Sequence, residues 1–260
     1  MFFSIITVSF NAEKTIAATL DSILEQDFED FEVIVTDGAS TDETVKILRQ
    51  YEERFHGKLR WKSEPDNGIY DAMNKGVALA QGEFVNFLNC GDSYWPKALA
   101  NVAEAIRLHP ETQVAYGLAR YFDAQGEMRL IREHHTRFRE WNICHQAIWY
   151  KRDLFSQYGM YDLAYRYLAD YDLNIRLFQA GVLFRPVDAI VVNYSLEGVS
   201  SDKSNSETGQ KEAMTIYYRH KMVDQAHYKW FMGSFARRRI FSSIRTTARK
   251  IYLLFSRAKQ

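Results

Sequence analysis

The sequence has too few cysteines, glycines and prolines for several classes of protein. Its 260 residues include only two cysteines, Cys90 and Cys144, which excludes a small disulfide-rich scaffold. Thirteen glycines and four prolines exclude collagen-like and low-complexity chains. The longest purely apolar runs, such as 251–255, fall far short of the ~18 residues of a membrane-spanning helix. The 47% of apolar residues therefore supplies the core of a globular protein.

Neither sign of charge is in excess overall, but the charges are unevenly distributed. Lys and Arg total 33, and so do Asp and Glu. Residues 229–260 contain nine of the basic residues and no acidic residue, which leaves 24 basic against 33 acidic residues in 1–228. We therefore expect an acidic body at 1–228 and a separate basic, amphipathic helical segment at 229–260.

Several targeting and enzyme motifs are missing as well. The first residues, MFFSIITVSFN, lack the basic region and cleavage site of a signal peptide, and with two free thiols we expect a cytoplasmic protein. There is no G-x-x-x-x-G-K-[ST], G-x-S-x-G or G-x-G-x-x-G motif, which argues against kinases, hydrolases and dehydrogenases. His145 has no second histidine at a zinc-ligand spacing, so the residues alone favour a structural role for it.

Strand and helix patterns alternate through the first half of the chain. The apolar, β-branched runs predict buried strands at 3–9, 31–36, 59–63 and 84–88. Helical periodicity follows each strand, and we expect Asn11 to cap the first helix and Thr41 or Ser40 the second. Four strand–helix units in succession predict an α/β fold with a mostly parallel central sheet flanked by helices.

The second half is less regular. Residues 114–123 and 128–132 predict a hairpin, and strands are expected at 145–151 and within 183–194. Helices are expected at 170–180 and 212–228. The polar stretch 198–209 is interpreted as a loop over the cleft.

Polar side chains gather where the predicted parallel strands end, which is where such sheets bind ligands. Each group also has a simpler interpretation. Asp37 either contacts a ligand or belongs to a turn. Asp71 and Lys75 either line the cleft or form a surface ion pair, and the same choice applies to Asp172 and Arg176.

The order of these motifs is more specific than any one of them. The chain reads ITVSFNAEKTIAATLDSIL, VTDGASTDET, SEPDNGIYDAMNKG, FLNCGD, HQA, ADYDL and GVS. Over roughly residues 3–200 it closely resembles family 2 glycosyltransferases of the GT-A fold. It looks most like bacterial enzymes of exopolysaccharide, O-antigen and colanic acid assembly. In such enzymes residues about 1–110 would bind the nucleotide and about 111–228 the acceptor.

The resemblance implies inverting transfer of a sugar from a nucleotide-diphosphate donor, with UDP favoured over GDP. It implies that Asp170 is the general base and that Asp92 holds Mn²⁺ or Mg²⁺. The implied nucleotide contacts are Thr7, Ser9, Asn11, Asp37, Asp66, Gly68, Asp71 and Lys75. His145, Gln146 and Asp172 would lie near the donor sugar or the acceptor. One departure is that Asn89-Cys90-Gly91-Asp92 keeps only the last carboxylate of the Asp-x-Asp metal motif.

Partners and alternatives remain open at this stage. The resemblance implies an acceptor linked to undecaprenyl diphosphate, and the basic segment 229–260 would bind the inner-membrane surface or pack on the body or on a second subunit. No nucleic-acid recognition module accompanies the basic charge. A nucleotidyltransferase would require a Gly- and Arg-rich first loop, which Ser9-Phe10-Asn11-Ala12 is not. A non-catalytic partner protein of the same fold is the remaining alternative.

Overall fold

The computed structural model describes residues 1–260 except 124–125, 127, 132, 139–141, 197–205 and 238–260. The chain forms two compact units, Met1–Ile216 and Tyr217–Gln260. The boundary falls inside helix α8 (Glu207–Arg219), earlier than the predicted boundary at 228.

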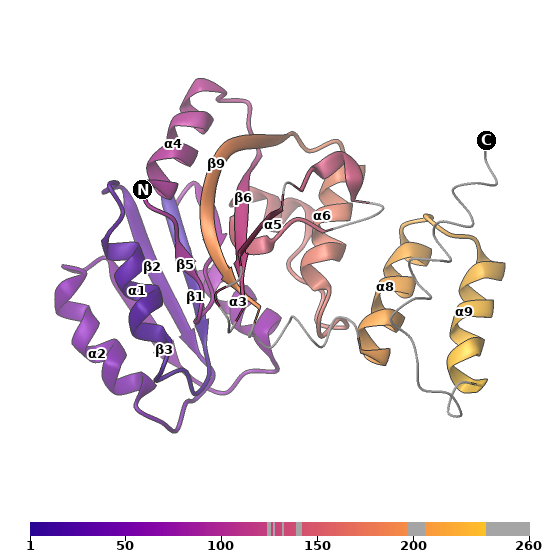
Figure 1. The fold of residues 1–260 in the computed structure, drawn as a ribbon, viewed down its shortest axis with the longest axis horizontal. Coiled ribbons are helices and arrows are strands. Elements are labelled where there is room, and N and C mark those ends of the chain that lie inside the picture. Colours follow the sequence, from indigo (N-terminus) through magenta and orange to yellow (C-terminus); the bar gives the residue numbers. More distant parts are fainter. Residues whose placement is uncertain (124–125, 127, 132, 139–141, 197–205, 238–260) are drawn as a thin grey trace. The chain divides into compact units, whose positions relative to one another are not determined.

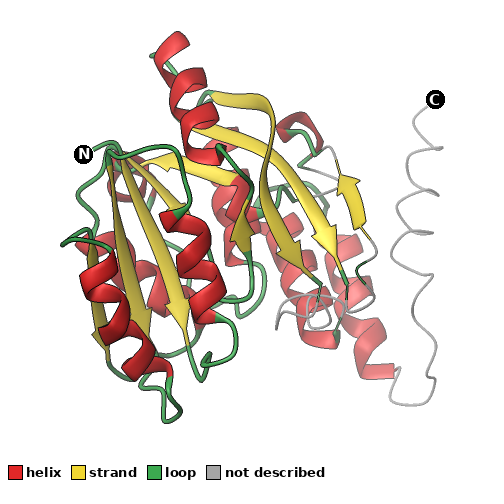
Figure 2. Ribbon diagram, turned by 60° about the vertical axis from the view of Figure 1, so that its left-hand side comes forward, coloured by secondary structure: helices red, strands yellow, loops and turns green. Residues whose placement is uncertain are grey.

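The first half forms the predicted parallel sheet. Strands β1 (Phe3–Ser9), β2 (Phe31–Asp37), β3 (Leu59–Ser63) and β4 (Phe84–Phe87) pair in the order β3-β2-β1-β4, all parallel. The helices between them are α1 (Ile16–Leu24), α2 (Thr44–Arg54) and α3 (Ile69–Leu79), and α4 (Ala98–Leu108) follows. Figures 1 and 2 show helices against both faces of the sheet.

The two faces of β1 bury different helices because successive side chains alternate. Phe3 and Ile5 belong to a core cluster that includes residues of α1, α2 and α4. Ile6 points to the other face, where a Cβ built on Gly76 of α3 would lie only 2.4 Å from Ile6 Cγ2. Glycine at 76 therefore lets α3 lie directly on the sheet.

The second half extends the sheet with mixed strand directions. Its strands are β5 (Ser93–Tyr94), β6 (Val114–Phe122), β7 (Met128–Ile131), β8 (Ile148–Lys151) and β9 (Phe184–Ser195). Strand β8 lies antiparallel between β4 and β6, while β9 is parallel to β6 and antiparallel to β5. The β6–β7 pair confirms the predicted hairpin.

The remaining elements are mainly helical. Two short 3₁₀ turns, His135–Arg137 and His145–Ala147, precede β8, and α5 (Asp153–Tyr158) and α6 (Ala169–Gln179) follow it. The prediction of one helix over 212–228 was wrong, because α8 ends at Arg219 and α9 (Gln225–Arg237) starts anew. Lys221 takes a positive φ of 57°, a conformation that stops a helix.

Both predicted helix caps were also wrong, because α2 begins at Thr44 with Glu43 as its N-cap residue and, like α1, has no side-chain cap. Helix α1 has no side-chain cap, and Asn11 instead accepts a hydrogen bond from Thr41 N at 2.9 Å. Asn11 N donates to Ser40 Oγ at 2.8 Å. These hydrogen bonds join the loop after β1 to the loop after β2, and they use the polar groups that were expected to cap the helices. Most of the predicted loop 198–209 falls within residues 197–205, which lie outside the described part of the chain. Its described part, 206–209, contains the beginning of α8.

Candidate active site

Asp37 is the centre of a hydrogen-bond cluster at the ends of three strands. Its carboxylate accepts from the hydroxyls of Ser9 (2.8 Å), Ser63 (2.6 Å) and Ser40, and from Ser40 N (2.9 Å). The residue is only 2% exposed. Asp37 therefore fixes the positions of the strand ends, and little of its carboxylate is left to meet a nucleotide base.

An exposed aromatic ring lies beside this cluster. Phe10 follows β1 and is 65% exposed. A Cβ on Gly38 would lie 3.3 Å from the Phe10 ring and 2.6 Å from Asp66 Oδ2, so only glycine lets the ring and the carboxylate converge there. The arrangement presents a flat aromatic face and a carboxylate oxygen at the carboxyl edge of the sheet.

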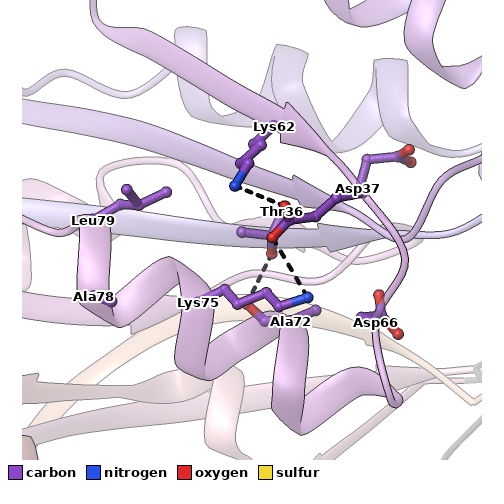
Figure 3. Close-up of a pocket in the computed structure, with 9 residues that line it drawn as sticks. Thr36, Asp37, Lys62, Asp66, Ala72, Lys75, Ala78 and Leu79 are labelled. Atoms are coloured by element: carbon purple, nitrogen blue, oxygen red, sulfur yellow. Dashed lines mark hydrogen bonds and ion pairs between the residues drawn. The ribbon is translucent and has the colours of Figure 1, made fainter.

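A charged hollow of about 180 Å³ lies between β2, β3 and α3 (Figure 3). Five charged residues, Asp37, Lys62, Glu64, Asp66 and Lys75, line it together with Thr36, Ala72, Ala78 and Leu79. Lys75 Nζ donates to Pro65 O at 2.9 Å and lies 3.5 Å from both Glu64 Oε1 and Asp71 Oδ2. Charged residues of both signs therefore border the hollow, while most of the surface that faces it is apolar.

The segment that begins α3 is shaped by its own turn chemistry. Gly68 has a φ of 113°, and its N–H donates to Asp66 Oδ1 at 2.8 Å. Asn67 N donates to Asp71 Oδ2 at 2.9 Å, and this bond is the largest of the effects that lower the pKa of Asp71. Asp71 and Lys75 also form the expected ion pair. Asp71 thus bonds to the turn that precedes its own helix and to Lys75, while Asp66 and Lys75 line the hollow.

Thr7 and Asp172 are placed away from any open surface. Thr7 is fully buried in β1, and its hydroxyl has no hydrogen-bond partner in the described part of the chain. Asp172 is likewise 0% exposed and pairs with Arg176 Nε at 2.8 Å. Arg176 in turn donates to the carbonyls of residues 158–160. We therefore drop Thr7 and Asp172 from the candidate contacts.

Asp92 is held by two segments of the second half. Its Oδ1 accepts from Ser195 N at 2.6 Å, and its Oδ2 accepts from Gln146 Nε2. Gln146 Oε1 also accepts from Asn89 N at 3.2 Å, so one amide side chain holds both ends of the Asn89–Asp92 loop. Burial raises the pKa of Asp92 to about 7.

This arrangement offers a cation one carboxylate and does not form a complete metal site from protein groups alone. Hard divalent cations take about six oxygen ligands, and Mg²⁺ is commonly held by one or two carboxylates together with waters and substrate phosphates. Both oxygens of Asp92 already accept N–H bonds, and the unpartnered buried oxygen in its loop, Asn89 Oδ1, is neutral. Among the described residues, no three His, Cys, Asp or Glu side chains gather as a metal site. A cation here would bind Asp92 together with the phosphates of a donor, and the chemistry below is derived from the residues of the chain itself.

Asp170 lies in the first turn of α6 and is held on both sides. Tyr70 Oη lies 2.7 Å from Oδ1, and Asn142 Nδ2 donates to Oδ2 at 2.7 Å. His145 Nδ1 lies 3.6 Å from Oδ2, and burial lowers the pKa of this imidazole. His145 Nε2 is also 3.1 Å from Asn89 Nδ2. The HQA segment thus contacts both carboxylates, Asp170 through His145 and Asp92 through Gln146.

Several of these residues were not predicted as site residues. Phe10 and Tyr70 lie within the quoted motifs but look like ordinary core aromatics. Asn142 and Glu133 come from irregular segments with no pattern. Glu133 accepts from Cys144 N at 2.6 Å and Tyr121 Oη at 3.1 Å, and burial raises its pKa to about 7.

Comparisons with known proteins agree on one family. Residues 4–163 match the family described as Glycosyl transferase family 2. The chain is 41% identical over 199 residues to a PGL/p-HBAD biosynthesis glycosyltransferase of Mycobacterium bovis, covering 74% of this chain and 76% of the relative. That relative gives no support to the narrower resemblance to exopolysaccharide and O-antigen enzymes.

Solved structures share the fold. Staphylococcus aureus TarS in complex with UDP-GlcNAc superposes with a TM-score of 0.70 at 20% identity, covering 91% of this chain and 72% of TarS. A Pyrobaculum calidifontis mannosyltransferase in complex with GDP-Man and Mn²⁺ gives 0.62 at 18% identity, covering 84% and 62%. These likenesses confirm the predicted GT-A-like α/β fold.

Proposed function

The chain belongs to glycosyl transferase family 2, and we propose that it transfers a sugar from a UDP-sugar to an acceptor hydroxyl with inversion at the anomeric carbon. The observation that carries this proposal is the placement of Asp170. The residue is 6% exposed, and Tyr70, Asn142 and His145 surround its carboxylate. A general base needs such fixed orientation toward the proton that it removes.

The nucleotide is proposed to bind at the strand ends around Asp37. The Phe10 ring is positioned to stack on the base, and Asp66 and Asn11 offer polar groups beside it. Lys75, in the hollow of Figure 3, supplies positive charge for the ribose–phosphate region. Ser9 and Asp37 support this site indirectly, because the hydrogen bond between them holds the strand ends together. A UDP donor is favoured because TarS, which shares the fold, was crystallised with UDP-GlcNAc.

The transfer step then follows from the placement of the base. Asp170 accepts the proton of the acceptor hydroxyl while the hydroxyl oxygen forms a bond to the anomeric carbon. The bond from that carbon to the donor's phosphate oxygen breaks, and the nucleoside diphosphate leaves with the electron pair. Inversion results because attack and departure take place on opposite faces. General-base catalysis of this kind contributes roughly 10²–10⁴-fold.

The acceptor is proposed to be a lipid-linked glycan at a membrane surface. No helix in the described part of the chain is long and apolar enough to span a bilayer. Nine basic residues and no acidic ones lie in 229–260, and Trp230 of α9 is 52% exposed. Such a segment suits anionic lipid, which adds about 1 kcal/mol per nearby basic side chain. Co-sedimentation with anionic vesicles should require residues 229–260; equal binding by a chain ending at 228 would overturn this.

A thermal-shift panel with UDP, GDP, dTDP and CMP, each with Mn²⁺ or with EDTA, tests the donor assignment. We expect UDP to raise the melting temperature in both conditions, since a ligand at 100 times its Kd stabilises by about 2.7 kcal/mol. A shift with GDP alone would overturn the UDP assignment. A UDP shift that needs Mn²⁺ would show that a cation does bind beside Asp92. No shift with any nucleotide would favour a non-catalytic partner protein.

A further inference from the structure

Glu212 of α8 accepts hydrogen bonds from the backbone just before the helix that carries Asp170. Its Oε1 accepts from Arg166 N at 2.8 Å, and its Oε2 accepts from Tyr167 N at 2.9 Å and Leu168 N at 3.2 Å. The residue is 8% exposed. One buried carboxylate therefore satisfies three consecutive N–H groups, and it comes from a helix more than 40 positions further along the chain.

Residues 166–168, whose N–H groups Glu212 holds, lie at the start of α6. Leu168 is the N-cap residue of this helix and makes no side-chain capping bond of its own. The first N–H groups of a helix need outside acceptors, and a carboxylate is favoured there by the helix dipole. Glu212 supplies an acceptor for the N–H of the N-cap residue and for the two N–H groups before it, and Asp170 is the second residue of the helix.

The same segment also meets the tyrosine that contacts Asp170. Tyr70 Oη lies 2.9 Å from Tyr167 O and 2.7 Å from Asp170 Oδ1. The backbone of Tyr167 is thus held on its N–H side by Glu212 and lies against Tyr70 on its carbonyl side. A shift of this segment would move Asp170 relative to Tyr70.

The other oxygen of Asp170 depends on a second fixed chain of bonds. Asn142 Nδ2 donates to Asp170 Oδ2, and Asn174 Nδ2 donates to Asn142 Oδ1 at 2.8 Å. Tyr150 Oη donates to Asn174 Oδ1 at 2.8 Å. Since these partners come from β8, α6 and the segment before β8, the carboxylate fits between them only if α6 begins at the correct place.

We propose that Glu212 is a positioning residue for the transfer step: by holding the N–H groups of 166–168 it sets the orientation of Asp170 between Tyr70 and Asn142. The proposal rests on the proposed function, in which Asp170 is the general base. Glu212 touches neither substrate in this account. It acts through the backbone that presents the base, so its loss is expected to lower kcat and to leave donor binding unchanged.

The test compares Glu212→Gln with Glu207→Gln in the full chain. Both substitutions remove one negative charge from α8, but the side chain of Glu207 is 63% exposed and pairs with Lys211 on the same helix. In Glu212→Gln the remaining oxygen can still accept, but the NH₂ group that replaces the other oxygen faces backbone N–H donors and cannot accept from them. A displacement of about 1 Å costs on the order of 10²-fold in rate. We expect that loss in kcat for Glu212→Gln, with unchanged Kd for UDP and unchanged donor KM, and wild-type values for Glu207→Gln.

A double-mutant cycle with Tyr70→Phe separates positioning from general destabilisation. If Glu212 acts through the Tyr70–Asp170 arrangement, the fold-loss in kcat of the double variant is expected to be smaller than the product of the losses in the two single variants. Fully multiplicative losses, or wild-type kcat in Glu212→Gln, would overturn the proposal. If Glu212→Gln does not fold, Glu212→Asp is tested in its place, and wild-type kcat in that variant would likewise overturn the proposal.

Failure of this proposal is distinguishable from failure of the proposed function. Loss of transfer in Asp170→Asn with full activity in Glu212→Gln removes only the role of Glu212. Full transfer by Asp170→Asn removes the general base, and the positioning proposal with it.

Discussion

The hydroxyl of Tyr70 lies 2.7 Å from Oδ1 of Asp170, although the two residues are 100 positions apart in the sequence. Burial raises the pKa of Tyr70 well above its usual value, so the phenol keeps its proton at working pH. Tyr70 therefore donates to the carboxylate and fixes one of its two oxygens. This contact joins helix α3, in the first half of the chain, to helix α6 in the second.

The first prediction concerns this contact. Tyr70→Phe keeps the ring and removes the hydroxyl. We expect a fall in kcat of roughly 10-fold, because a hydrogen bond to a charged acceptor is worth about 1.5–3 kcal/mol and only part of it orients the base. Steady-state kinetics should show an unchanged donor KM. A rise in KM without a fall in kcat would instead place Tyr70 in donor binding.

A second prediction concerns the exposed ring at the strand ends. Phe10→Ala should weaken UDP binding by about 1–2 kcal/mol, roughly 5- to 30-fold in Kd, because it removes the stacking surface for the base. Leu108→Ala is the matched control, since Leu108 is 69% exposed at the end of α4. Titration calorimetry measures both variants. Equal affinity in Phe10→Ala and wild type would remove the ring from the base site.

We expect Asp37 to contribute mainly to the stability of the fold. Asp37→Asn replaces one carboxylate oxygen by an NH₂ group that faces the N–H and hydroxyl donors of three strand ends. The expected loss is about 1–3 kcal/mol in the free energy of unfolding, measured by urea denaturation. Asp30→Asn, at a surface ion pair of 3.8 Å, should change it by less than about 0.5 kcal/mol. Equal stability of both variants would contradict the role assigned to the cluster.

Glu133 provides a prediction about pH. Burial raises its pKa from 4.5 to about 7, so the folded state binds its proton more tightly than the unfolded state does. The stabilising contribution of this group is therefore complete below about pH 4.5 and is lost as the pH rises through about 7. Glu133→Gln removes this dependence. Between about pH 5 and 8 the melting temperature of the wild type should fall relative to that of the variant, and parallel curves would contradict the assignment.

The position of the site could be predicted from the sequence because it follows from strand order. Apolar, β-branched runs predicted β1 to β4, and the ends of parallel strands necessarily meet at one edge. The motifs at those ends placed Asp37, Asp66 and Lys75 near one another, as the hollow confirms.

The partners of these residues could not be predicted in the same way. An asparagine before a helix looks the same whether it caps that helix or bonds to Thr41, 30 positions away. The sequence shows a lone carboxylate at 92 but not that Gln146 and Ser195 hold its two oxygens in place. Glu212 gives no signal at all, because its three acceptor contacts exist only once α8 lies against the start of α6.

The most direct test is the initial rate of UDP release from UDP-sugars in the presence of acceptor lipid extract, compared between wild type and Asp170→Asn. Asp153→Asn, an exposed residue of α5, controls for the loss of one charge. The account predicts that Asp170→Asn loses roughly 10²–10⁴-fold in rate while binding UDP with wild-type affinity, and that Asp153→Asn loses nothing. Near wild-type release by a folded Asp170→Asn protein would contradict the assignment of Asp170 as the general base.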